Sequence, residues 1–160
     1  MSVRAKGFTL IEMAVTAAIV GLLATVAFPM AEIAAQRSKE QELHTDLRQL
    51  REALDAYKQA WNDGHMFRKV GESGYPPSLQ ILVDGVEDAK SPEPIKPRMY
   101  FLRKIPRDPF NNDSSVPPEL SWGRRSYAST AAAPKAGNDI YDVYSLATGA
   151  GLNGIPYRDW

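Results

Sequence analysis

The sequence contains no cysteine and only two histidines, His44 and His65. Without cysteine the chain has neither a disulfide framework nor a thiolate for nucleophilic chemistry. The two histidines have no metal-ligand spacing to another ligand type, so we expect a solvated surface role for both. The lack of cysteine does not fix the compartment, because an exported domain can be stabilised by packing alone.

The chain also lacks net charge, since it has 19 basic and 19 acidic residues. No overall field therefore draws it to nucleic acid or to an acidic membrane. One group of basic residues could still converge into a patch that binds DNA. Acidic neighbours favour a solvated rim or an intersubunit salt-bridge surface instead, and we expect no nucleic-acid partner. The group consists of Arg103, Lys104, Arg107, Arg124 and Arg125.

Sequence motifs of catalytic and nucleotide-binding sites are missing as well. There is no G-x-S-x-G, no P-loop and no dinucleotide fingerprint. Lone serines such as Ser126 and Ser145 are better interpreted as strand residues. If the protein were a membrane-anchored enzyme, its catalytic groups would have to be scattered carboxylates, which nearly every soluble domain has. We therefore expect that the protein is not an enzyme.

What the chain does have is a long apolar run from Phe8 to Phe28, in which Glu12 is the only charged residue. As a helix this run is about 30 Å long, enough to cross the hydrocarbon core of a bilayer. Arg4 and Lys6 precede it, which predicts a cytoplasmic N-terminus and an exported remainder. A cleaved signal peptide is the alternative, with small residues available in "MAEIAA". The length of the run and the early Glu12 count against it.

Glu12 is unusual because a carboxylate within a membrane segment is costly and needs a partner. Cleavage between Gly7 and Phe8 would create an α-amino group at Phe8. Since Phe8 and Glu12 are four residues apart, this amine could lie on the same helix face as the carboxylate. It could equally belong to a neighbouring copy of the chain. The alternative is a glutamate that reaches water at the cytoplasmic interface.

The stretch "KGFTLIE" resembles the prepilin-peptidase site of type IV pilins and type II secretion pseudopilins. The resemblance implies a leader peptide, residues 1–7, that ends at Gly7, and a mature N-terminus at Phe8 that the same peptidase N-methylates. Thr9 and Leu10 complete the processing motif. It also implies that Glu12 pairs with the Phe8 amine of an adjacent subunit during assembly.

Gly21 and Pro29 predict a weak point in the helix. Proline lacks an N–H group and clashes with the carbonyl four residues back, so a kink or local melting is expected at Pro29. Pilin-like proteins have a glycine and a proline at matching positions, which implies that this part of the helix can unwind in a filament. An ordinary proline at the end of a membrane helix is the alternative.

Residues 29–61 continue as an amphipathic helix, because apolar residues recur at intervals of four and three. We expect one helix from Phe8 to about Trp61, ended by "NDG" at 62–64. A coiled coil is the alternative, but the stripe is short and has no clear e/g charge code. Packing against the C-terminal part of the chain is preferred. The stripe is Leu43, Leu47, Leu50, Leu54, Tyr57 and Trp61.

Residues 62–160 are predicted to form a loop-rich head that contains a small antiparallel sheet laid on the amphipathic half of the helix. A short helix is expected at "PSLQILVDG", and strands are expected at 98–102, 124–128 and 141–146. The stretch "IPRDPFNNDSSVPPELSWG" is too rich in proline for a central strand. The fold class is therefore α+β.

The head resembles the G-type major pseudopilin of type II secretion at "GYPPSLQILV", "FLRKIPRDPF", "WGRRSY" and "YDVYSL". One departure is that the family's contiguous D-P-W-G is split by residues 111–121. We expect these residues to form a surface loop available for contact with another subunit. The other departure concerns calcium, which the resemblance places in the loop after the last motif. That loop, residues 146–154, contains no carboxylate, so a glycine-rich turn held by backbone hydrogen bonds and Trp160 packing is preferred. Calcium would need Asp139, Asp142 and Asp159 to fold back onto the loop.

The resemblance as a whole implies a pilin-like structural subunit of a type II secretion pseudopilus. Its implied partners are copies of itself, minor pseudopilins, the prepilin peptidase, an inner-membrane assembly platform, an ATPase and, before assembly, membrane lipid. The implied location is the bacterial inner membrane, with one span and a periplasmic head, and then a periplasmic pseudopilus. A type IV pilin for motility, adhesion or DNA uptake is the alternative.

Overall fold

The computed structural model describes residues 7–68, 70–92 and 96–160. The chain divides into two compact units, Met1–Ser38 and Lys39–Trp160. Most of the predicted leader, including Arg4 and Lys6, lies outside the described residues. The predicted boundary at residue 28 separates the membrane half of the helix from its amphipathic half, and the one at residue 61 separates the helix from the head. The division into compact units does not test these two boundaries, so they stay predictions.

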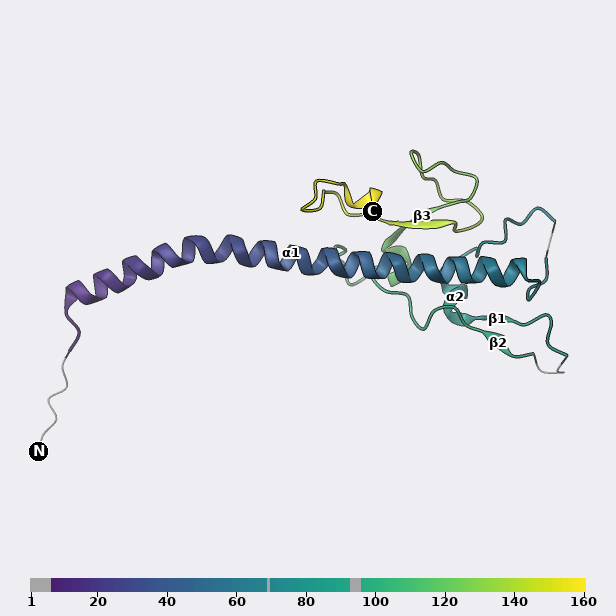
Figure 1. Ribbon diagram of the computed structural model, residues 1–160, viewed down its shortest axis with the longest axis horizontal. Helices are drawn as coiled ribbons and strands as arrows, with labels where there is room; N and C mark the ends of the chain where they lie inside the picture. The colour runs from purple at the N-terminus through teal and green to yellow at the C-terminus, as the bar shows by residue number, and fades with distance from the viewer. Residues whose placement is uncertain (1–6, 69, 93–95) are drawn as a thin grey trace, which may run out of the picture. The chain divides into compact units, whose positions relative to one another are not determined.

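The main element is helix α1, Leu10–Asn62, which confirms the helix predicted from Phe8 to about Trp61 (Figure 1). In the first unit the helix continues through Gly21 and Pro29 without a break. Local melting at Pro29 is therefore not seen. A kink there, and unwinding in an assembled filament, stay predictions.

In the second unit the predicted leucine stripe of α1 forms the core. Leu43, Leu47, Leu50 and Leu54 are at most 1% exposed, and they pack with residues of the head. This confirms packing within the chain as the role of the stripe. The residues that complete the buried cluster are Ala53, Tyr57, Met66, Leu79, Leu82, Leu102, Trp122, Ile140, Val143 and Tyr157.

The head contains the predicted short helix, α2, Gln80–Asp84, and two 3₁₀ turns, η1, Pro118–Leu120, and η2, Tyr157–Asp159. Its strands are β1, Val86–Glu87, β2, Arg98–Met99, β3, Trp122–Arg125, and β4, Asp142–Ser145. In Figure 1, β3 lies on one side of the ribbon of α1, while α2, β1 and β2 lie on the other.

The predicted α+β fold class is confirmed, and the strands pair antiparallel as expected. They form two separate pairs rather than one small sheet, β1 with β2 and β3 with β4. The predicted strand 98–102 ends early, since the N–H groups of Phe101 and Leu102 both donate to the Leu82 carbonyl of α2, each at 3.0 Å. The predicted strand 124–128 ends at Arg125, because Ser126 N–H donates to the Lys135 carbonyl of the following loop.

Candidate functional site

The first candidate site is the start of α1, where Thr9 and Glu12 form a reciprocal cap. Glu12 Oε2 accepts hydrogen bonds from the Thr9 backbone N–H at 2.8 Å and from Thr9 Oγ1 at 2.9 Å. The Glu12 N–H in turn donates to Thr9 Oγ1 at 3.3 Å. This arrangement is a capping box, which satisfies N–H groups that the first helical turn leaves without partners. Sequence reasoning missed it, although the T-x-x-E spacing was present.

The side chains around this cap are open to the surroundings. Phe8 is 82% exposed and Leu10 is 88% exposed, and Gly7 and Glu12 are exposed too. Within the described part of the chain, Glu12 Oε1 makes no hydrogen bond. The structure thus brings together the motif residues Gly7 to Glu12 at one helix end, with one carboxylate oxygen left for a further partner. The pairing of Glu12 with the Phe8 amine stays a prediction.

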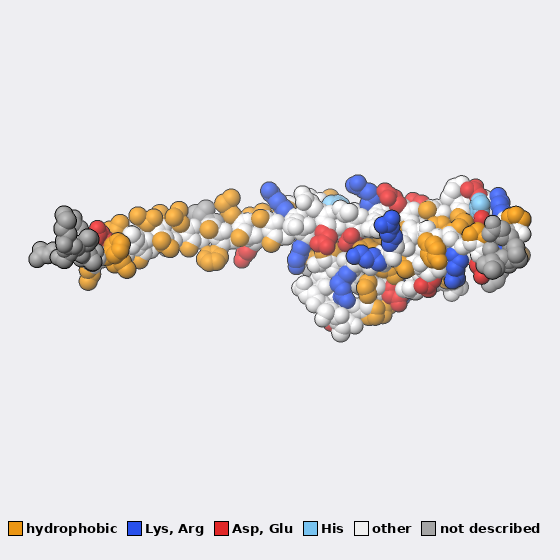
Figure 2. Space-filling view, turned by 90° about the horizontal axis from the view of Figure 1, so that it is seen from below, with side chains coloured by type: hydrophobic (Ala, Val, Ile, Leu, Met, Phe, Trp, Pro, Cys, Tyr) orange, Lys and Arg blue, Asp and Glu red, His pale blue; other side chains and the backbone are white. Residues whose placement is uncertain are grey.

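The apolar half of α1 follows directly after this cap and presents a hydrophobic surface. The described residues include one helix that is long and apolar enough to cross a membrane. Its most apolar 18-residue stretch has a mean hydropathy of 2.1, and none of that stretch is buried. Figure 2 shows hydrophobic side chains all along the visible face of this half. The hydroxyls of Thr16 and Thr25 donate to the carbonyls of Met13 and Leu22, so they need no water.

The second candidate site lies in the head, where Asp108 of the "RDPF" stretch meets β4. Asp108 is 1% exposed. Its Oδ2 accepts a hydrogen bond from Ser145 Oγ at 2.5 Å, and its Oδ1 accepts one from Phe110 N–H at 2.8 Å. Its own N–H donates to Ser121 Oγ at 3.1 Å. Asp108 therefore joins both sides of the 111–121 insertion to the last strand, a role that sequence reasoning did not assign.

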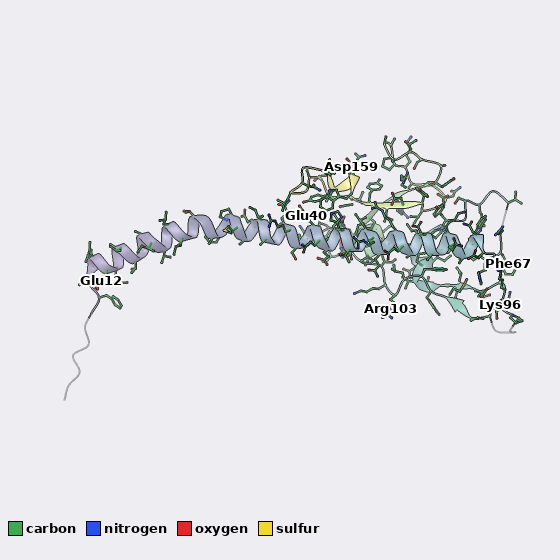
Figure 3. All side chains as sticks on the ribbon, in the orientation of Figure 1. Glu12, Glu40, Phe67, Lys96, Arg103 and Asp159 are labelled. Atoms are coloured by element: carbon green, nitrogen blue, oxygen red, sulfur yellow. The ribbon has the colours of Figure 1, made fainter. Side chains whose placement is uncertain are left out.

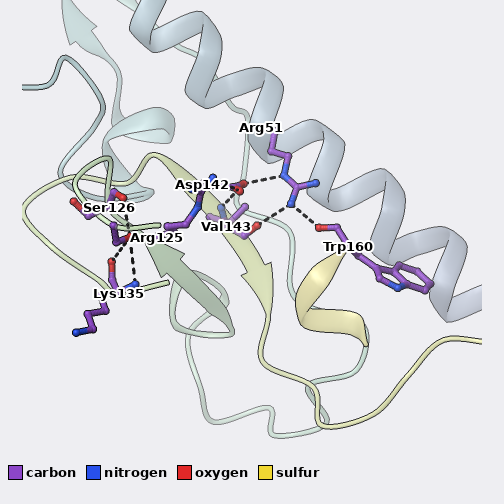
Figure 4. Close-up of polar contacts among 8 residues, drawn as sticks. Arg51, Arg125, Ser126, Lys135, Asp142, Val143 and Trp160 are labelled. Carbon is purple, nitrogen blue, oxygen red and sulfur yellow. Dashed lines mark hydrogen bonds and ion pairs between the residues drawn. The ribbon is translucent and has the colours of Figure 1, made fainter. Parts of the chain in front are cut away.

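Arg51 of α1 makes a second link to the same strand (Figure 4). Its Nε donates to Asp142 Oδ1 at 2.9 Å, and its Nη2 donates to the carbonyl of Val143 at 3.2 Å and to the main-chain oxygen of Trp160 at 2.6 Å. Arg125 donates to Asp142 Oδ2 at 3.1 Å. Two guanidinium groups thus neutralise Asp142, and the head is fixed to α1 at β4.

The three aspartates named as calcium candidates are not brought together. Asp142 is bound by the two arginines, whereas Asp139 accepts hydrogen bonds from Ser126 Oγ at 2.5 Å and Tyr127 N–H at 3.0 Å. Burial raises the pKa of Asp139, but these hydrogen bonds and one from Ser73 bring it below its usual value. Asp159 is exposed beside Arg158. No group of three or more histidine, cysteine, aspartate or glutamate side chains that could hold a metal ion exists among the described residues.

The other sequence candidates have structural partners. His44 is exposed and stacks on Trp160, with ring centroids 4.1 Å apart. His65 is only partly exposed rather than fully solvated, and its Nδ1 lies 2.9 Å from Asp88 Oδ1. The ring is half-buried because the turn at Asp88 folds back over the end of α1, where Ala89 N–H donates to the His65 carbonyl.

The basic residues do not act as one patch. Arg107 donates to carbonyls of Asp113, Ser114 and Val116 in the insertion, and Arg125 pairs with Asp142. Arg103, Lys104 and Arg124 are exposed. Most of residues 111–120 are exposed, which confirms the predicted surface loop. Its contact with another subunit stays a prediction.

Comparison with known proteins points to one family. The family model for the prokaryotic N-terminal methylation motif matches residues 3–28. Type II secretion system core protein G of Klebsiella pneumoniae is 32% identical over 156 residues, which are 96% of this chain and 89% of that protein. Core protein G of Vibrio cholerae serotype O1 is 32% identical over 108 residues, 67% of this chain and 66% of that protein. Core protein G of Aeromonas hydrophila is 27% identical over 140 residues, 85% of this chain and 89% of that protein. No solved structure matches.

Proposed function

The chain belongs to the family of type II secretion system core protein G, which consists of pseudopilin structural subunits, and we propose that it polymerises through its apolar N-terminal helix to drive protein export across the outer membrane. One observation carries the proposal. The motif residues Gly7 to Glu12 lie at the start of a helix whose first half is apolar and exposed at nearly all of its described side chains. Such a surface needs either lipid or copies of itself around it.

Exchange of lipid for neighbouring subunits gains little from the hydrophobic effect, since both surroundings are apolar. Association must come from close packing and from polar contacts between helices. Small residues suit close packing, and Ala14, Ala17, Gly21 and Ala24 recur at helical spacing along this half. Because the free energy gained when subunits replace lipid is small, we propose that an assembly ATPase, acting through a platform protein, supplies the work of assembly.

Glu12 supplies the polar contact. The Thr9 cap satisfies Oε2 in the single chain but leaves the negative charge without a counter-ion in the described residues. A cut between Gly7 and Phe8 would supply a positive α-amine in an adjacent subunit, and the pair would neutralise both charges within the apolar assembly. This pairing makes processing a condition for assembly.

The same helix suits both processing and membrane anchoring before assembly. The prepilin peptidase removes residues 1–7 and N-methylates Phe8, and the helix holds the precursor in the inner membrane with the head in the periplasm. Minor pseudopilins join the same filament. The subunit is not an enzyme and binds no nucleic acid. A type IV pilin is not favoured, because the relatives are named as secretion core proteins.

The test compares Glu12→Ala and Glu12→Gln with wild type in a host whose own core protein G gene is deleted. We expect both variants to remain in the membrane fraction and to lose sheared filaments and secretion, because neither carries the charge. Glu32→Gln, an exposed acidic residue of the same helix, is the matched control and should assemble normally. Normal filaments from Glu12→Ala would exclude the pairing.

Peptide mass spectrometry of the membrane-purified protein tests processing separately. We expect a chain that begins at N-methylated Phe8. An unmethylated chain that begins after Phe28 would indicate a signal peptide and would overturn the filament proposal.

A further inference from the structure

The C-terminal loop, residues 146–154, does not fit the calcium ion that the family resemblance implies. Calcium takes six or more oxygen ligands, several of them charged. The loop has no carboxylate, and Asn153 Oδ1 already accepts a hydrogen bond from Ile155 N–H at 3.0 Å. The flanking Asp142 has both oxygens bound by arginines, and Asp139 is engaged by Ser126 and Tyr127.

A carboxylate from α1 reaches this loop instead. Glu40 Oε1 accepts hydrogen bonds from Leu152 N–H at 2.9 Å and from Tyr157 Oη at 3.0 Å. Figure 3 shows Glu40 on α1 close to the C-terminal segment that carries Asp159. One negatively charged oxygen thus binds the tip of the loop and the turn that follows it. Hydrogen bonds to a charged acceptor are stronger than those between neutral groups.

The loop is also closed on itself, as the sequence predicted for a glycine-rich turn. Gly151 N–H donates to the Ile155 carbonyl at 2.9 Å, and Gly154 N–H donates to the Gly151 carbonyl at 2.8 Å. Trp160 Nε1 donates to the Ile155 carbonyl at 3.1 Å. A Cβ atom on Gly151 would lie 2.2 Å from the Trp160 ring, so this glycine allows the ring to cover the loop.

Arg51 fixes the two ends of the segment that contains the loop. It binds the Val143 carbonyl before the loop and the Trp160 main-chain oxygen after it. Arg51 and Glu40 are eleven positions apart (51 − 40). Eleven residues make about three helical turns, so both side chains project from the same face of α1. An anion and a cation on one helix face therefore hold the tip and the ends of the segment.

We propose that Glu40 and Arg51 hold the C-terminal loop in the place where relatives would use calcium, so that the head folds and stays folded without the metal. All of these contacts lie within Lys39–Trp160 of a single chain. Their loss can therefore be measured without filament assembly, and the outcome does not depend on the proposed function.

The first measurement is thermal unfolding of the full chain in detergent, after treatment with EGTA and again with millimolar calcium chloride. Buried Trp122 provides the fluorescence signal. We expect the two midpoints to agree within about 1 °C, because a ligand that does not bind the native state does not stabilise it. A midpoint that calcium raises by several degrees, and that EGTA lowers again, would overturn the proposal.

The second measurement is hydrogen exchange at the Leu152 amide in Glu40→Ala, with Glu52→Ala as the exposed control on the same helix. We expect exchange at least about fivefold faster than in the control, because the amide loses its charged acceptor. Exchange equal to that of the control would contradict the role of Glu40. If Glu40→Ala does not fold, Glu40→Gln replaces it. Its neutral oxygen is a weaker acceptor, so a smaller increase over Glu52→Gln is expected, and no increase would overturn the proposal.

Discussion

Replacement of Asp108 by alanine should destabilise the head more than its size suggests. The side chain is almost fully buried and accepts hydrogen bonds from Ser145 Oγ and Phe110 N–H. Alanine would leave both donors buried without the acceptor they now use. Asparagine is the matched variant, since its amide oxygen can accept from Phe110 and its NH₂ group can donate to Ser145 Oγ.

The magnitude follows from these two donors. A buried donor left without a partner costs about 1–3 kcal/mol. Two of them sum to about 2–6 kcal/mol, and we expect about 2–4 kcal/mol, because Ser145 Oγ can rotate and still accepts from Ala147 N–H. Loss of the charge also relieves a small repulsion of Asp46, to which Asp108 contributes. Asparagine should cost about 1 kcal/mol.

Urea unfolding of the full chain in detergent measures this difference. Trp122 is a suitable reporter, because it is buried near Asp108 and its Nε1 donates to the Pro106 carbonyl at 2.9 Å. The free energy of unfolding should fall in the order wild type, Asp108→Asn, Asp108→Ala. If the alanine variant lies within about 0.5 kcal/mol of wild type, the buried hydrogen bonds do not stabilise the head as argued. Equal losses for both variants would show that charge, rather than the acceptor, is what matters.

Two further predictions concern the second unit. Leu50→Ala should lower the free energy of unfolding by about 2–5 kcal/mol, because it opens a cavity under a fully buried side chain, while exposed Gln49→Ala should change it by less than about 0.5 kcal/mol in the same urea assay. Burial, with Glu42 and Asp108 next in importance, raises the pKa of Asp46 from 3.8 to about 6. The folded state then binds this proton more tightly than the unfolded state does, so this residue makes stability fall as the pH rises from about 4 through 6. Asp46→Asn should flatten this fall and stabilise the head at pH 7 by up to about 1 kcal/mol after solvent screening, and an unchanged pH profile would contradict the assignment.

The parts of the fold that could be predicted from the sequence are those that depend on the pattern of neighbouring residues. The helix Leu10–Asn62 and its buried leucines could be predicted because neighbouring residues set a 3.6-residue repeat. The short helix expected within "PSLQILVDG" is Gln80–Asp84, which is also a local segment. The glycine-rich turn was predicted because its residues lacked charged ligands, which is also a local property.

The parts that sequence did not predict depend on long-range contacts. Asp108 and Ser145 are 37 residues apart, and no local pattern indicates that they share a hydrogen bond. Strand β1 has only two residues, too few for an alternating pattern to be visible. No local pattern separates Glu40 from the other acidic residues of the amphipathic helix, because its partner Leu152 lies 112 residues further on. The Thr9–Glu12 cap is the exception, since its signal was local and was overlooked.

The two halves of α1 differ in how much of their apolar surface remains exposed in the single chain, and this difference affects how the subunit can assemble. From Leu43 onward the apolar stripe is covered by the head of the same chain. Between Leu10 and Phe28 the large apolar side chains that the structure describes are exposed. The first half therefore has apolar surface that another subunit can contact without disturbing this core. A subunit that joins a filament through this half need not open its core, so addition and removal can occur without unfolding and refolding of the head.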